Sequence, residues 1–347
     1  MLPATRPASA APRALCASLL ALAGLPAPLL AQEPPPAASG DLAVVEYPIP
    51  RAGAFPHDPA VGADGMVWYT DQANSYIGRL DPRTGTFTDW ATPTPQSGPH
   101  GITVAPDGGV WYTGNRVGKI GRLDPATGQI REYTLPAEAT DPHTPIWVDG
   151  TLWFTVQGAN LYGRLDPATG KSAVYPVPAP RARPYGIAEA PDGSLWVALL
   201  GTNALGRIDR KDDSMTLERL PHEGARPRRL VVDARGRVWY TDYARSRLGR
   251  YDPATRAFEE WATPNEGGRP YGIAIGVDGR VWYAETATGL MVAADPAAGA
   301  TVRTLEIPTP NAVVRHMVSD PERGDLWLAL SGTGRIGRIA LGGPGGS

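Results

Sequence analysis

Hydrophobic and polar residues alternate along this chain in short runs, without the three-to-four-residue rhythm of an amphipathic helix. Runs of four to seven β-branched and aromatic residues, such as 67–70, are separated by Asp-Gly or Thr-Gly pairs, such as Asp107-Gly108 and Thr84-Gly85. Glycine readily adopts the positive φ of a tight hairpin turn, so runs bounded in this way predict β-strands joined by hairpins. The pattern therefore predicts an all-β chain.

Tryptophans recur at a nearly constant spacing, and the same four predicted strands surround each one. Successive spacings are 43, 42, 43, 43, 43 and 45 residues. The repeated residues are Trp68, Trp111, Trp153, Trp196, Trp239, Trp282 and Trp327. Four short strands in a repeat of this length are typical of a β-propeller blade. Seven repeats predict a seven-bladed β-propeller of four-stranded blades, with each repeated tryptophan buried between blades.

The two ends of the repeat predict how the ring closes. A strand of the kind that ends each repeat lies at 44–50, before the first tryptophan, whereas the last repeat stops after 336–339 without one. We therefore expect the N-terminal strand to complete the last blade, which makes 41–341 one domain. An arginine recurs in the third strand of six blades, and this repetition indicates a shared packing or ion-pair role. These arginines are Arg79, Arg122, Arg164, Arg207, Arg250 and Arg338.

The N-terminal segment predicts export. Two arginines precede an apolar stretch that ends near Ala31, which is typical of a signal peptide over 1–31, followed by a linker over 32–40. A membrane anchor is the alternative, but glycine and prolines interrupt a span that is barely long enough. The only cysteine, Cys16, lies in this segment, so the mature chain is expected to be cysteine-free and periplasmic or secreted. Residues 342–347 are expected to form a flexible tail.

The net charge of the chain restricts the kinds of molecule that we expect it to bind. The chain carries 33 Lys and Arg against 35 Asp and Glu, a formal net charge of -2. No polybasic segment marks a surface for nucleic acid or for anionic lipid. We therefore expect a small-molecule ligand or substrate in the propeller funnel, no nucleic acid, no membrane in the mature form, and a monomer.

Two repeat positions are expected to face one end of the central channel, because the start of the innermost strand and the end of the second strand meet there. The first position holds His57, His100, His143, Tyr185, Arg228, Tyr271 and Arg315. The second position, three residues after each tryptophan, holds Asp71, Gly114, Val156, Leu199, Asp242, Glu285 and Leu330. Blades that are otherwise alike differ at these positions, so this is where we look for function.

Three of the five histidines occupy the first position in consecutive blades. With Asp58, Asp71, Asp242 or Glu285 they can hold a divalent cation or act as acid and base groups. The alternative is structural: each histidine bonds a backbone carbonyl of its own loop, and Arg228 pairs with Asp242. We assign His57, His100, His143 and Tyr271 as candidate catalytic residues, and Asp71, Asp242 and Glu285 as candidate metal ligands.

Tyrosines and arginines at the same rim suggest ligand binding. Tyr185, like Tyr271, can bond a ligand carbonyl, and Arg228, Arg269 and Arg315 can hold a carboxylate. His316, next to the blade-seven position, is a further candidate that would turn inward in place of Arg315. This set predicts a small anionic or peptide-like ligand.

The repeated text "PHGI" (99–102), "DGGVWYT" (107–113), "IGRLDPATG" (120–128) and "EYTLP" (132–136) resembles the virginiamycin B lyases, also called streptogramin lyases, over essentially the whole mature chain. The resemblance implies a seven-bladed propeller. It also implies a lyase that opens cyclic depsipeptide antibiotics by elimination, with Mg²⁺ steadying the developing charge and a histidine taking the proton.

The family places this machinery on the last two blades, and the present chain departs from it there. Tyr271 stands where the sixth blade would carry histidine, and Val313-Val314-Arg315 stands where the seventh would carry Glu-Pro-His. Only Glu285 keeps an acid near the expected place. Two functions therefore stay open: a metal-assisted lyase acting on a cyclic depsipeptide or another ester-containing small molecule, and a non-catalytic periplasmic propeller that binds a ligand or a protein.

Overall fold

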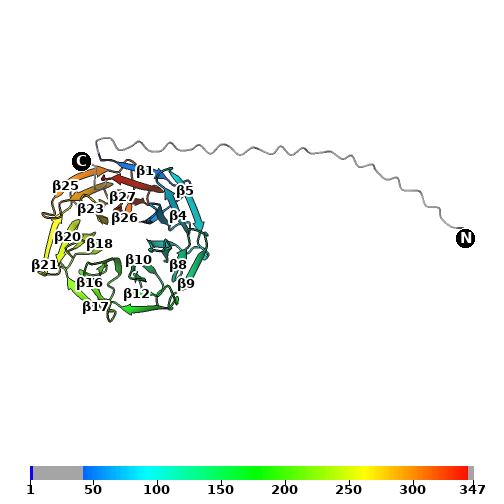
Figure 1. Ribbon diagram of the computed structural model, residues 1–347, viewed down its shortest axis with the longest axis horizontal. Helices are drawn as coiled ribbons and strands as arrows, with labels where there is room; N and C mark the ends of the chain where they lie inside the picture. The colour runs from blue at the N-terminus through cyan, green and yellow to red at the C-terminus, as the bar shows by residue number, and fades with distance from the viewer. Residues whose placement is uncertain (3–41, 343–347) are drawn as a thin grey trace. The chain divides into compact units, whose positions relative to one another are not determined.

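The computed structural model describes residues 1–2 and 42–342, so the predicted linker, all but the first two residues of the predicted signal peptide and all but the first residue of the predicted tail lie outside the described residues. Within 42–342 the chain forms seven four-stranded antiparallel sheets and no helix, arranged radially around a central axis (Figure 1). This confirms the predicted all-β, seven-bladed propeller. No helix in the described part of the chain is long and apolar enough to cross a membrane.

Strands one and two of each blade lie nearest the axis and pair antiparallel. The innermost strands are β2 (Pro56–Val61), β6 (Pro99–Val104), β10 (Pro142–Val148), β14 (Pro184–Glu189), β18 (Pro227–Val232), β22 (Pro270–Ile275) and β26 (Val314–Asp320). The second strands, which carry the repeated tryptophans, are β3 (Val67–Asp71), β7 (Val110–Gly114), β11 (Thr151–Val156), β15 (Leu195–Leu199), β19 (Val238–Asp242), β23 (Val281–Glu285) and β27 (Asp325–Leu330).

Strands three and four form the outer half of each blade. The third strands are β4 (Tyr76–Asp81), β8 (Lys119–Leu123), β12 (Leu161–Leu165), β16 (Ala204–Asp209), β20 (Arg247–Asp252), β24 (Leu290–Ala294) and β28 (Arg335–Ala340). The outermost strands are β5 (Thr86–Ala91), β9 (Ile130–Thr134), β13 (Ser172–Pro176), β17 (Ser214–Arg219), β21 (Ala257–Ala262), β25 (Thr301–Glu306) and β1 (Val44–Pro48).

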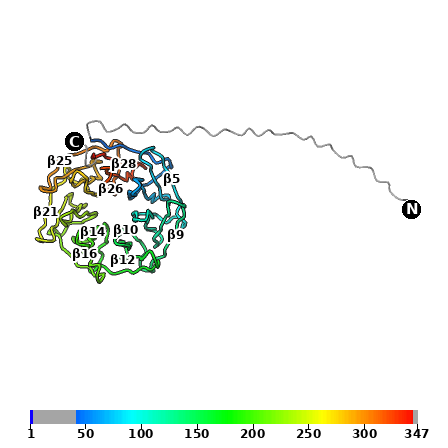
Figure 2. The backbone as a smooth tube through the Cα atoms, in the orientation of Figure 1, coloured from blue at the N-terminus to red at the C-terminus, as the bar shows by residue number. Residues whose placement is uncertain are grey.

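The first strand of the chain closes the ring, as the repeat predicts. β1 pairs with β28 in the sheet β1-β28-β27-β26, with Val44 opposite Ile339. Figures 1 and 2 show this blue strand beside the red end of the chain. Glu46 of β1 also accepts a hydrogen bond from the backbone N–H of Thr309 at 3.1 Å. Closure leaves no blade with an unpaired second or third strand.

The core lies between blades, and the repeated tryptophans are in it. All seven are at most 3% exposed, and Trp68 packs against Ile102 and Val110 of the next blade. An arginine of the third strand lies over the ring in several blades, for example Arg207 with its Cζ 5.8 Å from the Trp196 centroid, and it also pairs with Asp192 at 2.7 Å. The repeated arginines thus have the predicted packing or ion-pair role, for example packing on Trp68 and Trp90 for Arg79 and an ion pair with Asp213 for Arg164.

The glycine before three of these arginines is explained by the close approach of a tyrosine. A Cβ added at Gly78 would lie 2.0 Å from the Tyr69 ring, and Gly121 and Gly249 meet the tyrosines of their own blades in the same way. Only glycine leaves room for a tyrosine to cross the neighbouring strand at this distance. The repeated Gly-Arg pair is therefore part of the blade architecture rather than of a site.

Candidate functional site

Each innermost strand carries a β-bulge immediately after its first residue. In β2, two residues, His57 and Asp58, lie opposite a single residue, Thr70, of β3. A bulge bends the strand and re-aims the side chains beside it. The two bulge residues line different cavities along the axis: His57 lines one and Asp58 lines the other.

In four of the seven blades, a threonine of the second strand fixes the bulge to the neighbouring blade. The Thr113 hydroxyl accepts a hydrogen bond from the Gly101 N–H at 2.9 Å and donates one to the carbonyl oxygen of His143 at 2.7 Å. Thr70 donates in the same way to the His100 carbonyl, and Thr155 to the Tyr185 carbonyl. These buried bonds hold the backbone of the first-position residues, so the side chains start from a rigid rim.

The first-position residues line a cavity of about 800 Å³, which we call the arginine-rich cavity. Six of them contribute: His57, His100, His143, Tyr185, Arg228 and Arg315. Loops add Arg181, Arg183 and Arg226, and the residue that follows the second strand adds Gln72, Asn115, Gln157, Leu200 and Tyr243. Five arginines and no carboxylate therefore line this cavity.

The three histidines form a row of closely spaced rings, each tilted by 43° relative to the next. Ring centroids lie 3.7 Å apart for His57 and His100 and 3.6 Å apart for His100 and His143, and Tyr185 continues the row 4.0 Å from His143. Nδ1 of His57 lies 2.8 Å from the Asp58 carboxylate, and Nδ1 of His143 lies 3.0 Å from the Thr144 hydroxyl. Neither bond goes to a backbone carbonyl, which the structural alternative required.

Burial and nearby positive charge keep this row neutral. Burial lowers the pKa of His57 to about 4, although its hydrogen bond to Asp58 acts in the opposite direction. Burial also lowers the pKa of His100 and of His143, assisted by the neighbouring histidine at His100 and by Arg229 at His143. At neutral pH the row therefore offers uncharged imidazoles.

Arg228 is held inside the cavity by aromatic rings. Its Cζ lies 3.6 Å from the centroid of Tyr271, 4.4 Å from that of Tyr243 and 5.1 Å from that of Tyr185. It donates one hydrogen bond to the Tyr185 hydroxyl at 3.3 Å, and that hydroxyl also contacts the Tyr271 hydroxyl. The guanidinium is thus positioned by cation–π contacts rather than by a carboxylate. The sequence alternative of an Arg228–Asp242 pair does not form.

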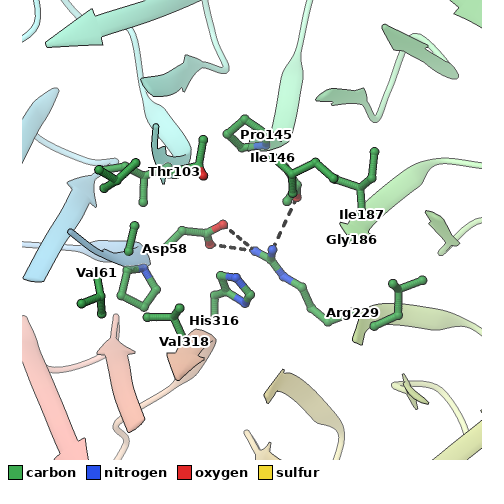
Figure 3. A pocket seen from close by; sticks show the side chains of 16 residues that line it. Asp58, Val61, Thr103, Pro145, Ile146, Gly186, Ile187, Arg229, His316 and Val318 are labelled. Atoms are coloured by element: carbon green, nitrogen blue, oxygen red, sulfur yellow. Dashed lines mark hydrogen bonds and ion pairs between the residues drawn. The ribbon is translucent and has the colours of Figure 1, made fainter. Parts of the chain in front are cut away.

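Two of the second bulge residues form an ion pair across the channel beneath this rim. Asp58 and Arg229 point toward one another across the axis (Figure 3), with Nη2 of Arg229 at 2.7 and 2.9 Å from the two carboxylate oxygens. Both side chains are almost fully buried. Burial raises the pKa of Asp58, but the charge of Arg229 together with His316 and the hydrogen bond from His57 outweighs this effect and holds the pKa well below its usual range.

This ion pair borders a second, narrower cavity of about 230 Å³, shown in Figure 3. His316 lines this cavity, whereas Arg315, one residue earlier, lines the arginine-rich cavity. The sequence offered the two residues as alternatives for one place. The bulge gives each its own place, on opposite sides of the Asp58–Arg229 pair.

The arginine-rich cavity gathers six of the nine expected catalytic and ligand-binding residues, while His316 lines the narrower cavity and the other two line neither. Tyr271 lies behind Tyr185, contacting its hydroxyl, and does not itself line the arginine-rich cavity. Arg269 is exposed, with its Cζ 6.0 Å from the Tyr243 centroid, and does not line it either.

The three expected metal ligands do not converge. Each is buried at the end of a second strand and bonds residues of the loops beside that end: Asp71 bonds Arg51 and Asn74, and Asp242 bonds Arg245. Glu285 accepts hydrogen bonds from the backbone and side chain of Asn265. None lines either axial cavity. The carboxylate that does lie beside the histidines is Asp58.

Sequence reasoning missed the residues that follow these carboxylates. Gln72, Asn115, Gln157 and Tyr243 stand four residues after a repeated tryptophan, one place beyond the position considered, and these residues face the cavity. The signal was present in the repeat, since three consecutive blades carry an amide there. Arg181 and Arg183 gave no such signal, because they lie in a loop where both adopt positive φ, of 53° and 51°.

The donor set does not suit Mg²⁺. Among the described residues, one group can bring three ligand atoms within 4.8 Å of one another: His57, Asp58 and His100. Mg²⁺ prefers oxygen ligands in octahedral geometry, and here the only carboxylate is already engaged by Arg229. The arginines of the adjacent cavity would also repel a dication. The expected Mg²⁺ stays a prediction that these residues do not favour, and we derive no step through it.

Comparison with known proteins places the chain in a family. The sequence profile of the virginiamycin B lyase family matches residues 37–208 and 171–345. Virginiamycin B lyase from Staphylococcus aureus, as its selenomethionine form, superimposes with a TM-score of 0.80 at 25% identity, covering 87% of this chain and 100% of that one. A streptogramin B lyase structure gives 0.79 at 25% identity, covering 86% and 97%.

A third structure shares the fold at lower identity. It is a catalytically inactive histidine-to-alanine variant of the S. aureus enzyme with quinupristin, with a TM-score of 0.80 at 24% identity, covering 87% of this chain and 100% of that one. No curated protein sequence gives a match. The profile spans the entire propeller and the superposition on the S. aureus lyase covers 87% of this chain, so this chain belongs to the virginiamycin B lyase family.

Proposed function

We propose that this protein binds a small molecule carrying carboxylate or phosphate groups in the arginine-rich cavity. The observation that carries the proposal is the charge of the lining: five arginines and no carboxylate. Unpaired guanidinium groups held close together repel one another, and an anionic ligand relieves that repulsion while accepting paired hydrogen bonds. The volume of about 800 Å³ is within the range of small-molecule sites.

Two of the arginines are already held in position for binding an anion. Arg228 is fixed over Tyr271 and Tyr243, and Arg315 lies over the Phe55 ring at 5.1 Å. Among the residues that the structure describes, neither forms an ion pair. A guanidinium that is already positioned loses little side-chain entropy when it binds, which favours affinity.

Calorimetric titration with succinate and with inorganic phosphate at low salt tests the proposal. We expect binding that weakens as salt is added, and a loss of about tenfold or more in affinity for Arg228→Gln and for Arg315→Gln. Arg83→Gln is the matched control, because Arg83 is an exposed arginine outside the cavity. Absence of binding for both anions, or equal affinity in all three variants, would contradict the proposal.

A second candidate function is a lyase reaction on an ester-containing small molecule, such as a cyclic depsipeptide of the streptogramin B type. The pairing of His57 with Asp58 favours it, because a carboxylate on Nδ1 leaves Nε2 free to act as a base. The base would take a proton from carbon, a C=C bond would form, and the C–O bond would break to release a carboxylate. Arg228 and Arg315 are placed to stabilise the developing negative charge.

Incubation with quinupristin, followed by chromatography with mass detection, tests this second function. Elimination opens the ring without a change of mass, whereas hydrolysis adds one water. We expect a product of unchanged mass that His57→Gln abolishes and that EDTA leaves unaffected. No product would leave ligand binding alone, and a product lost with EDTA would show that a metal takes part.

We also propose that the protein is exported and acts as a monomer. The apolar segment after Arg13 and the lack of cysteine after Cys16 support export. The closed ring supports a monomer, because each blade already packs against two neighbours. Cell fractionation with N-terminal sequencing, and the mass of the purified protein in solution, test the two statements.

A further inference from the structure

The lining of the arginine-rich cavity is divided around the axis. Blades one to three each supply a histidine at the first position and a side-chain amide after the second strand: His57 with Gln72, His100 with Asn115, and His143 with Gln157. We call these six residues the histidine–amide wall. The arginines come from blades four, five and seven and the loops that precede their innermost strands. One side of the cavity is thus neutral and the other is positive.

Hydrogen-bond chemistry at the neutral side restricts what can lie there. Asp58 is ionised and accepts a hydrogen bond from His57, so Nδ1 of His57 carries the proton. In a neutral imidazole the other nitrogen, Nε2, is then an acceptor. A carboxylate oxygen placed there would face a lone pair, whereas a hydroxyl group would donate a hydrogen bond. The ligand therefore needs a donor at this end.

The amides of the wall offer several further bonds. Within the described part of the chain, the side-chain amides of Gln72 and Gln157 have no hydrogen-bond partner, and Asn115 uses only its Nδ2, donated to the Pro142 carbonyl at 3.0 Å. Each amide can accept from one hydroxyl group and donate to another, so neighbouring hydroxyls on one carbon skeleton match this wall. A ligand without hydroxyls would exclude water from these amides without giving them hydrogen-bond partners, and this loss lowers the binding affinity.

We infer that the ligand is a hydroxylated carboxylic acid of the sugar-acid type, with its carboxylate toward Arg228 and Arg315 and its hydroxyl groups toward the histidine–amide wall. This inference rests on the proposed anion binding and adds the chemical class of the ligand. The cavity of about 800 Å³ has room for one or two sugar rings.

Calorimetric titration of the mature protein with four probes tests the inference. Glucuronate and digalacturonate carry both the acid and the hydroxyl groups, succinate has acid groups alone, and glucose has hydroxyls alone. We expect at least one of the two sugar acids to bind about tenfold or more tighter than succinate, with glucose weakest, because a site built to bond hydroxyl groups rejects ligands that lack them. Succinate binding as tightly as both sugar acids would overturn the inference and leave the proposed anion binding intact.

Variants of the wall separate its role from that of the arginines. The double variant Gln72→Leu/Gln157→Leu is expected to lose about tenfold in affinity for the sugar acid that binds better while keeping its affinity for succinate. Arg228→Gln is expected to weaken both. Gln129→Leu, an exposed glutamine outside the cavity, is the control. An equal loss for sugar acid and succinate in the double variant contradicts the inference, and no binding of any acid by the parent protein contradicts the proposed function as well.

Discussion

Two arginine–aspartate pairs in this propeller share their chemistry and differ in everything around them. Arg207 and Asp192 lie on the outside of a blade, with side chains 43% and 56% exposed, and the Arg207 guanidinium covers a buried tryptophan as in other blades. Arg229 of blade five and Asp58 of blade one meet on the axis, and their side chains are 1% and 2% exposed. The outer pair has an equivalent in another blade, Arg122 with Asp107, because it is part of the repeat. The axial pair joins two residues whose positions in other blades carry different residue types.

The two pairs show which positions are alike in most blades and which differ from blade to blade. The outer layer is the same in most blades because each blade must pack against the next in the same way. The axial layer differs from blade to blade because it need not repeat, so cavity, neutral histidines and buried ion pair all occur there. Stability and function should therefore respond differently to changes in the two layers, except at the axial pair itself.

The largest expected effect is at the axial pair. Asp58→Ala leaves the buried Arg229 without its counter-charge and should lower the free energy of unfolding by about 3–5 kcal/mol, measured by urea denaturation. The double variant Asp58→Ala/Arg229→Met should recover much of this loss, because it removes the stranded charge. A single variant as stable as the parent would mean that the axial pair is as dispensable as an exposed one.

The pH dependence of stability should reveal the neutral histidine row. The pKa of His57 is about 4 in the folded protein against about 6.5 when unfolded, so the unfolded chain binds a proton that the folded one does not. The free energy of unfolding should therefore fall by about 3 kcal/mol from this residue as pH drops from 6.5 to 4. Urea denaturation of the parent and of His57→Gln at pH 7 and pH 4.5 measures it. The same pH dependence in both proteins would show that His57 does not contribute.

A smaller effect is expected from the threonines that fix the bulges. Thr113→Val keeps the shape but removes the acceptor for the Gly101 N–H and the donor to the His143 carbonyl. We expect a loss of about 1–2 kcal/mol in the free energy of unfolding, together with weaker ligand binding as the histidine row loosens. Thr216→Val, an exposed threonine of an outer strand, serves as the control. Unchanged stability would imply that water replaces the buried hydroxyl.

The smallest effect should come from the outer layer. Arg207→Gln breaks an exposed ion pair and a cation–π contact, which together stabilise the fold by about 0.5–1 kcal/mol. Thermal denaturation measures this change, and ligand affinity should not move, because Arg207 is outside the arginine-rich cavity. A change in affinity would mean that the two layers are coupled.

The repeat made the fold predictable from sequence, whereas the site was only partly so. The period of the tryptophans and the incomplete last unit predicted the blades and their closure, and the same phase placed His57, His100 and His143 side by side at the rim. The residues after the second strands that line the cavity lie one place beyond the second repeat position, the position that the sequence pattern predicted. The side chain at that second position, the last residue of each second strand, points into the blade instead. Asp71 and Glu285 there bond the loops beside them rather than the cavity.

What could not be predicted depends on geometry across the ring. Asp58 and Arg229 are 171 residues apart in sequence and meet only because the ring closes. Arg181 and Arg183 reach the cavity from a loop whose positive φ angles no repeat pattern encodes. Contacts of this kind arise from the diameter of the propeller and the shape of its loops, which hydrophobic periodicity does not record.

The bulge in every innermost strand has a consequence for how such a protein can change over time. Because two adjacent residues line two separate cavities, a mutation in one codon changes a residue of the arginine-rich cavity without replacing the residue that lines the narrower cavity. His57 and Asp58, Arg228 and Arg229, and Arg315 and His316 are three such adjacent pairs. A new binding preference can thus be acquired one blade at a time, while the Asp58–Arg229 ion pair across the axis is kept.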